Sequence, residues 1–241
     1  MLTFLRKIRK SLIKSGRTRK YFFYAIGEIA LVVIGILIAL QINNWNEWRK
    51  DRLKETKVLK EVQSSLLRNC ELLSDYIDNH RMCNSSADTI LTAIEKKLPY
   101  RNSYGYHFHM ARVDLPINFV SLSGYEELKN AGFDIIQNDS LKSEILAIFE
   151  NTYPRMQEIL DGFKTTNQPF LEHIRHHFYD RSFENKLIPV NYDQVINDHY
   201  YYSALMNTKG LRGWYIRQQE ACLSESRRVI QLIKDELGES E

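Results

Sequence analysis

The chain has 241 residues, and its 33 Lys and Arg against 30 Asp and Glu leave a formal net charge of +3. Apolar residues make up 44%, with only ten glycines, five prolines and three cysteines. These counts exclude collagen, low-complexity disorder, disulfide scaffolds and multi-span membrane proteins. The small net charge, with its basic excess at one end, argues against a dedicated nucleic-acid binder. A mainly helical chain with a sizeable core is expected.

The first twenty residues form a basic leader with no acidic side chain. Apolar residues recur within it at helical spacing, which predicts an amphipathic helix lying on anionic lipid; simple disorder is the alternative. The predicted lipid-headgroup contacts of the leader are Arg6, Lys7, Arg9, Lys10 and Lys14.

Residues 21–42 form an apolar run whose strongly polar members are Glu28 and Gln41. A helix of this length rises about 33 Å, enough to cross a bilayer. Aromatic residues crowd its start, and Trp45 and Trp48 follow its end, so both tryptophans are further predicted headgroup contacts. A cleaved signal peptide is the competing interpretation, but no small-x-small cleavage site follows the run. We expect an uncleaved transmembrane anchor.

Flanking charge sets the expected orientation of this anchor. Eight Lys and Arg precede it, and six lie in residues 43–60. The positive-inside rule then places the N-terminus in the cytoplasm and the rest of the chain outside, in the periplasm of a Gram-negative cell.

A stripe within the span combines one carboxylate with small residues. A charged residue inside a membrane costs about 2–4 kcal/mol, so it normally faces protein or water. The stripe also suits close packing of membrane helices, which predicts association through this face; a snorkelling Glu28 is the alternative. At steps of three and four, its residues are Ala25, Glu28, Val32, Gly35 and Ala39.

The stretch YAIGEIALVVIGILIALQINNWNEWRK resembles the opening of domain-of-unknown-function family 6090, a family of single-span membrane proteins from Bacteroidota. The resemblance is specific over about residues 4–50 and loose afterwards. It implies a bacterial inner-membrane location and an all-helical exterior. It implies no activity.

Residues 43–98 are expected to form a long helical stalk or hairpin. Asn84-Ser85-Ser86 is predicted to break it, with a second helix ending before Pro99. A buried stripe is predicted at Leu59, Val62, Leu66, Leu73 and Ile77.

Residues 99–241 are predicted to form an irregular extracytoplasmic helical bundle, which makes the fold mainly α with one N-terminal transmembrane helix. Residues 100–120 alternate in polarity, which indicates a short strand or an ordered loop. Ser123 and Glu126 match a capping box that starts a helix from Gly124 to Ala131, with Gly132 as its left-handed stop.

Asn138-Asp139-Ser140 is expected to supply the cap of the next helix, and Pro154 suits the first turn of another. Pro169 and the Gly210–Gly213 segment are predicted to interrupt the helices that follow. The predicted inner face of the terminal helix consists of Trp214, Gln218, Ala221, Cys222, Val229, Leu232 and Ile233.

Histidines give the main metal hypothesis. His173 and His177 share one helix face, with His176 between them and the pair His107 and His109 elsewhere. A zinc site needs a third ligand, and neither HExxH nor a repeated Glu-x-x-His pair is present. A solvated helix face is the expected interpretation, with no metal and no cofactor.

The remaining motifs give no catalytic prediction. Cys70, Cys83 and Cys222 are expected to be buried thiols, and any disulfide would have to use Cys222. Gly210-Leu211-Arg212-Gly213 has the spacing of an RNA-clamping turn, but its surroundings favour a helix–helix junction. Phosphate-binding loops and a GxSxG elbow are absent from the sequence.

These observations predict a non-enzymatic, membrane-anchored scaffold or interaction protein. Its expected partners are membrane lipids and either a second copy or another membrane protein, with no nucleic acid. An alternative, by analogy of layout, is an accessory or stator-like subunit of an ion-driven inner-membrane complex that uses Glu28. A membrane-tethered enzyme is the third possibility and depends on the histidines alone.

Overall fold

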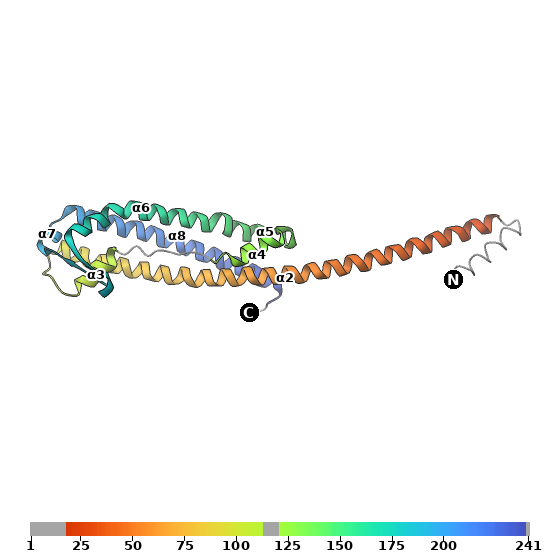
Figure 1. Ribbon diagram of the computed structural model, residues 1–241, viewed down its shortest axis with the longest axis horizontal. Coiled ribbons are helices and arrows are strands. Elements are labelled where there is room, and N and C mark those ends of the chain that lie inside the picture. Colours follow the sequence, from red (N-terminus) through yellow and green to blue (C-terminus); the bar gives the residue numbers. More distant parts are fainter. Residues whose placement is uncertain (1–17, 113–120, 240–241) are drawn as a thin grey trace. The chain divides into compact units, whose positions relative to one another are not determined.

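The computed structural model describes residues 18–112 and 121–239, and most of this part of the chain is helical (Figure 1). The mainly α fold predicted from the sequence is therefore confirmed. The chain divides into two compact units, residues 1–54 and residues 55–241, called here the N-terminal unit and the bundle unit. The first 17 of the 20 residues of the predicted amphipathic leader lie outside the described residues, and with them Arg6, Lys7, Arg9, Lys10 and Lys14.

Helix α2 (Thr18–Glu95) begins in the N-terminal unit and includes the apolar run. Its most apolar window has a mean hydropathy of 2.5, and none of that window is buried. Within the described residues, this is the one helix long and apolar enough to cross a membrane. The expected membrane-spanning segment therefore exists as a helix.

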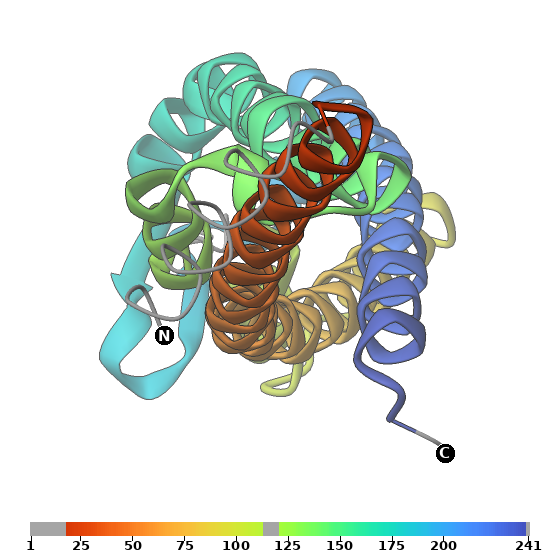
Figure 2. The same cartoon turned by 90° about the vertical axis from the view of Figure 1, so that its right-hand side faces the viewer.

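Three long helices build the bundle unit: residues 55–95 of α2, α6 (Tyr153–His177) and α8 (His199–Leu237). Figure 2, which looks along the bundle, shows them arranged around a common interior. All five positions of the predicted stripe on α2 are buried, which confirms that prediction: Leu59, Val62, Leu66, Leu73 and Ile77.

The bundle interior contains two apolar clusters. The first joins residues 58–77 of α2 to the start of α6 and the later half of α8. The second joins residues 87–94 of α2 to the end of α6 and the start of α8. A buried or half-buried polar layer lies between the clusters on all three helices, and its residues are His80, Asn84, Ser86, Asn167, Thr208 and Arg212.

The predicted break at Asn84-Ser85-Ser86 is wrong, because α2 runs through it to Glu95. The Asn84 side chain donates to the Lys209 carbonyl at 3.4 Å and accepts from Arg212 at 3.2 Å. Ser86 is buried beside the ring of His107. These polar side chains therefore bond to neighbouring helices instead of ending their own.

The predicted strand or loop within residues 100–120 is also wrong where the structure describes it, because α3 (Tyr104–Arg112) is a helix. Tyr104, Phe108 and Ala111 are its buried apolar residues, at helical spacing. Residues 113–120 lie outside the described part. The alternation of aromatic and polar residues was therefore a misleading signal.

A β-hairpin that the sequence analysis missed packs against α3. Strands β1 (Phe178–Arg181) and β2 (Lys186–Pro189) pair antiparallel, with Phe178 opposite Pro189. The 3-10 turn η3 (Ser182–Glu184) and the left-handed Asn185 connect them.

Helix α4 (Ser123–Ala131) confirms the predicted helix, but the capping box is wrong because no side chain caps its N-terminus from within. Gly132 ends it with a φ of 89°, a positive value as expected, although its ψ of 133° is not that of a left-handed helix. After η1 (Phe133–Ile135), a residue of the predicted capping segment caps α5 (Asp139–Leu146): the side chain of Asn138 accepts from the Leu141 amide.

The π-helix η2 (Ala147–Thr152) leads into α6, where Pro154 occupies the first turn as predicted. Pro169 does not interrupt α6. Buried residues on both sides of it hold the helix in the bundle: Asn167 accepts from Thr208 at 2.7 Å, and Phe170 belongs to the second cluster.

After the short α7 (Tyr192–Ile196), α8 runs without a break at Gly210 or Gly213, so the predicted junction there is wrong. Fully buried Arg212 anchors this segment through the Ala111 carbonyl. The predicted inner face is correct at Cys222, Val229 and Ile233, which are buried, and partly so at Gln218 and Leu232, which are half-buried; it is wrong at Trp214 and Ala221, which are exposed.

Candidate functional site

The stripe Ala25, Glu28, Val32, Gly35 and Ala39 lies on α2, where steps of three and four place its members on one helix face. Glu28, Val32, Gly35 and Ala39 are exposed. Among the described residues, no atom would lie within 4 Å of a Cβ added at Gly35. This face is therefore open to another helix.

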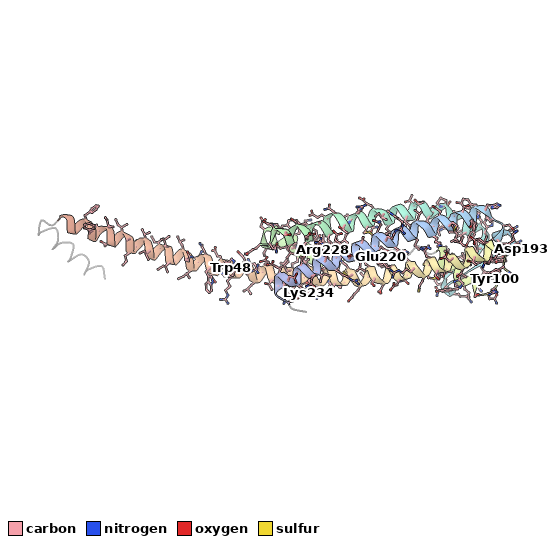
Figure 3. The ribbon with its side chains drawn as sticks, turned by 180° about the vertical axis from the view of Figure 1, so that it is seen from behind. Trp48, Tyr100, Asp193, Glu220, Arg228 and Lys234 are labelled. Atoms are coloured by element: carbon pink, nitrogen blue, oxygen red, sulfur yellow. The ribbon has the colours of Figure 1, made fainter. Side chains whose placement is uncertain are left out.

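Trp45 and Trp48 lie after the apolar run on the same helix. They are 60% and 53% exposed, and Figure 3 shows Trp48 projecting from α2. An exposed indole at the end of an apolar helix suits a membrane interface, where the ring contacts both the lipid acyl chains and the headgroups.

Charged side chains on the surface of the bundle unit pair between helices. Glu220 and Arg228 on α8, labelled in Figure 3, pair with Arg81 on α2 and Glu144 on α5. Exposed ion pairs of this kind add little to stability, because water and salt screen them. These charges therefore favour the register of the helices.

A buried hydrogen-bond chain crosses the first cluster. Asn69 on α2 donates to the Tyr153 hydroxyl at 3.4 Å, and that hydroxyl lies 3.2 Å from Ser226 on α8. Burial raises the pKa of Tyr153 above its ordinary value, against the effect of these two bonds. The tyrosine therefore stays neutral and ties three helices together.

The polar layer contains groups whose hydrogen bonds are incomplete. Both ring nitrogens of His80 are buried without a protein partner among the described residues. Burial first, and then the charge of Arg212, lowers the pKa of His80 to about 4. The imidazole is therefore neutral in the folded chain at pH 7.

The cysteines agree with the prediction of buried thiols. Cys70, Cys83 and Cys222 are all buried, and none of them forms a disulfide. Burial raises the pKa of Cys222 to about 12, so its thiolate is scarce at neutral pH.

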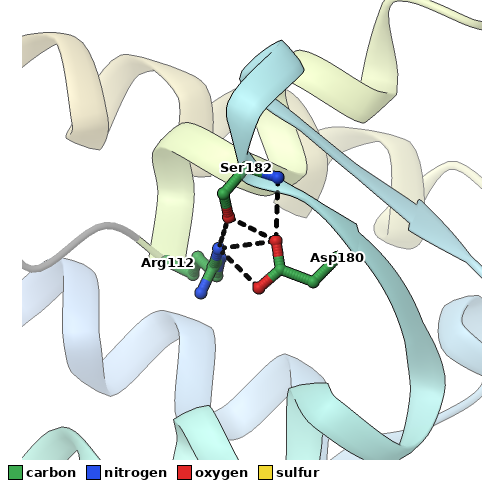
Figure 4. Close-up of polar contacts among 3 residues, drawn as sticks. All are labelled: Arg112, Asp180 and Ser182. Carbon is green, nitrogen blue, oxygen red and sulfur yellow. Dashed lines mark hydrogen bonds and ion pairs between the residues drawn. The ribbon is translucent and has the colours of Figure 1, made fainter.

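A polar contact holds the β-hairpin on α3, as Figure 4 shows. Arg112 donates to both carboxylate oxygens of Asp180, at 3.0 and 3.2 Å, and to the Ser182 hydroxyl at 2.6 Å. Burial acts to raise the pKa of Asp180, but the Ser182 hydroxyl and the Arg112 charge outweigh it and lower that pKa. The hairpin base is therefore fixed to α3 through an ionised carboxylate.

His173 and His177 lie together at the end of α6, with ring centroids 4.3 Å apart. Asp198, the N-cap of α8, supplies a third ligand type that the sequence analysis missed. No local pattern indicated it as a ligand, because an Asp at the start of a helix is ordinarily a cap. His176 is exposed, and His107 and His109 lie on α3.

Two small grooves lie between α6 and α8. One, of about 240 Å³, is lined by apolar residues including Phe163, Leu211 and Trp214. The other, of about 190 Å³, lies beside Met156 and Cys222. Pockets for drug-sized ligands usually have volumes of about 300–1,000 Å³, so both grooves are smaller than that class of site.

Comparison with known proteins gives one match. No curated protein and no solved structure matches the chain. Residues 28–97 match the model of a family of unknown function, DUF6090. This range takes in most of the apolar run and continues through the part of α2 that packs in the bundle. The family whose model matches the segment from Glu28 to Lys97 is thus the one that the sequence resembles, DUF6090.

Proposed function

We propose that this protein is a non-enzymatic, membrane-anchored interaction module that associates through its span and presents the bundle unit outside the cytoplasm. The observation that carries the proposal is the contrast between two apolar surfaces. The apolar side chains of the bundle unit form closed clusters, whereas no residue in the most apolar window of the run is buried. An exposed apolar helix of that length needs lipid or another helix around it.

The uncleaved anchor is supported by the course of α2. One continuous helix holds the apolar run, both tryptophans and the stripe buried in the first cluster. The chain after the run is therefore helical. Signal peptidase cleaves after a small-x-small motif, and this segment has no such motif. With eight basic residues before the span, the same proposal places the N-terminus in the cytoplasm of a bacterial cell and the bundle unit in the periplasm.

Association through the span is supported by the stripe. Glu28 shares its face with small residues, so a partner helix could approach closely and hydrogen-bond the carboxylate. The partner is a second copy or another membrane protein, and lipid covers the rest of the helix.

The test is a pair of matched substitutions in the full chain, solubilised in mild detergent. Gly35→Leu fills the stripe, and Gly27→Leu makes the same change on a different face of α2. Neither added side chain would meet another described part of the chain at its Cβ, so an effect on oligomer size must arise between molecules. We expect Gly35→Leu to weaken oligomers, and Gly27→Leu and Val33→Leu to leave them intact.

Glu28→Ala should weaken association by about 1 kcal/mol or less, the usual value of a hydrogen bond within a membrane. Wild type that is monomeric at every concentration and retains no other membrane protein would refute the role of the stripe.

The alternative function, a subunit of an ion-driven complex, has a separate test. If Glu28→Gln abolished a proton-dependent activity while assembly persisted, that function would replace the scaffold.

Orientation has its own test. A reporter active only in the periplasm, fused after Glu241, should be active in bacterial cells. Activity of a cytoplasm-only reporter at the same position would overturn the proposed topology.

A further inference from the structure

The end of α6 and the start of α8 meet at the end of the bundle unit that contains α7 (Figure 1). His173 and His177 are four residues apart on α6, so both rings lie on one side of that helix. Asp198 reaches them from the N-terminus of α8, with its Oδ2 atom 2.6 Å from Nε2 of His173. The ligand atoms of all three side chains lie within 4.8 Å of one another.

The Asp198 carboxylate is held in a fixed orientation. Its Oδ1 atom accepts hydrogen bonds from the backbone amides of Tyr200 at 2.9 Å and Tyr201 at 3.0 Å. Burial acts to raise the pKa of Asp198, but the Tyr201 amide and His173 outweigh it and lower that pKa. The side chain is therefore ionised at neutral pH, with one oxygen bound to the helix and the other directed at the histidines.

Two imidazoles and one carboxylate are the three protein ligands of many catalytic zinc sites, in which water takes the fourth position. Zinc–ligand bonds of about 2.1 Å place ligand atoms roughly 3.4 Å apart in a tetrahedral site. The Nε2–Oδ2 distance between His173 and Asp198 is shorter than that value, at 2.6 Å, and all the ligand atoms lie within 4.8 Å of one another. Small side-chain rotations would therefore complete the geometry.

We propose that His173, His177 and Asp198 bind a divalent transition metal, with Zn²⁺ as the best match to this ligand set. Imidazole nitrogens favour such a metal over Ca²⁺ or Mg²⁺, which prefer oxygen ligands. The amides that hold Oδ1 act as the orienting outer shell that ligating carboxylates need. Because His173 and Asp198 retain 22% and 19% side-chain exposure, solvent can reach a fourth coordination position.

The bound metal would join α6 directly to α8 across the segment that contains the β-hairpin and α7. Binding therefore stabilises this end of the bundle unit and raises the thermal midpoint of the whole chain. This inference is independent of the proposed membrane role, since it uses no residue of the N-terminal unit.

The test uses the full chain in mild detergent, stripped of metal with a chelator and then titrated with Zn²⁺ by calorimetry. We expect a sharp end point at one equivalent and a thermal midpoint several degrees higher. Co²⁺ at the same site should give d–d absorption without a thiolate charge-transfer band, which separates this site from the cysteines.

His177→Ala is the decisive variant. If His173 and Asp198 only formed an ion pair with each other, His177 would not be needed. Loss of the calorimetric end point in His177→Ala therefore supports a metal site. Asp198→Asn should also abolish it, while retaining an oxygen that can cap α8. His176→Ala removes an exposed neighbouring histidine and should change nothing. Absence of binding at one equivalent, or binding that survives His177→Ala and Asp198→Asn, overturns the proposal.

Discussion

The hydroxyl of Ser65 on α2 accepts a hydrogen bond from the backbone amide of Gly124 on α4, at 2.9 Å. A residue 59 positions away along the chain thereby takes the capping role that Ser123 was expected to fill. The Ser123 hydroxyl instead lies 3.0 Å from that of Ser65. The start of α4 is therefore capped only when it is docked on α2.

Replacing Ser65 should measure how much this capping hydrogen bond contributes to stability, apart from the packing around it. Ser65→Ala leaves the amide of Gly124 without its acceptor in a buried position, so the free energy of unfolding should fall by about 1–2 kcal/mol. Urea unfolding followed by circular dichroism measures the change. Ser64→Ala removes only an exposed bond from Arg68 and should stay within about 0.5 kcal/mol of wild type; equal losses in both variants would contradict the capping role.

Gly124 is required by the close approach of the two helices. A Cβ at this position would lie 2.6 Å from Cα of Val62 and closer still to the Glu61 carbonyl, both of them backbone atoms that cannot move aside. Gly124→Ala should therefore cost at least about 1–3 kcal/mol of stability, as overpacking does.

Gly210→Ala is the matched control for that substitution. Gly210 lies within α8 with no described atom near an added Cβ, and alanine is the better helix former. We expect this variant to gain about 0.5–1 kcal/mol in urea unfolding. A loss at Gly210 would contradict the continuity of α8.

Acid should destabilise the bundle unit through His80. Its pKa is about 4 in the folded chain and about 6.5 when unfolded, so the unfolded state binds more protons between these values. The stability that depends on neutral His80 is complete above about pH 6.5 and is lost as the pH falls towards 4, by at most about 1.4 kcal/mol per pH unit.

Denaturant unfolding at pH 7 and pH 5 measures this loss. His80→Gln should flatten the dependence, whereas His199→Gln, at an exposed position, should keep it. A residual slope is expected from His109, because burial also lowers its pKa. If His80→Gln and wild type had the same slope, the assignment to His80 would be wrong.

The thiols should be unreactive while the chain is folded. Burial raises the pKa of Cys70 as well as that of Cys222, so neither supplies much thiolate to a disulfide reagent. We expect native wild type to label at the rate of unfolding and urea-unfolded protein to label at once. Ser224→Cys, which places a thiol on the exposed side of α8, should label immediately in the native chain.

Much of the fold could be predicted from local patterns. The apolar run, the buried stripe on α2 and the Asn138 cap each depend on residues close in sequence, and each is present in the structure. The breaks predicted at Asn84 and at Pro169 failed because long-range contacts outweighed local propensity. Asn84 bonds to α8, and the residues around Pro169 are buried between helices.

The candidate sites show the same division. Glu28 and its stripe could be identified from spacing alone, because a helix fixes which residues share a face. The third ligand of the histidine cluster could not, since Asp198 follows His177 only after a hairpin and a short helix. The capping partner of α4 was hidden for the same reason: Ser65 and Gly124 are brought together by packing.

The polar layer divides the interior of the bundle unit into two independently packed ends. Each apolar cluster has its own buried side chains on α2, α6 and α8, and the two clusters share no residue. Amide hydrogen exchange should therefore occur in two cooperative blocks, not one. The end that carries the hairpin can open to solvent while the Leu59–Ile77 end of α2 keeps its protection, so local unfolding at one end need not release the other.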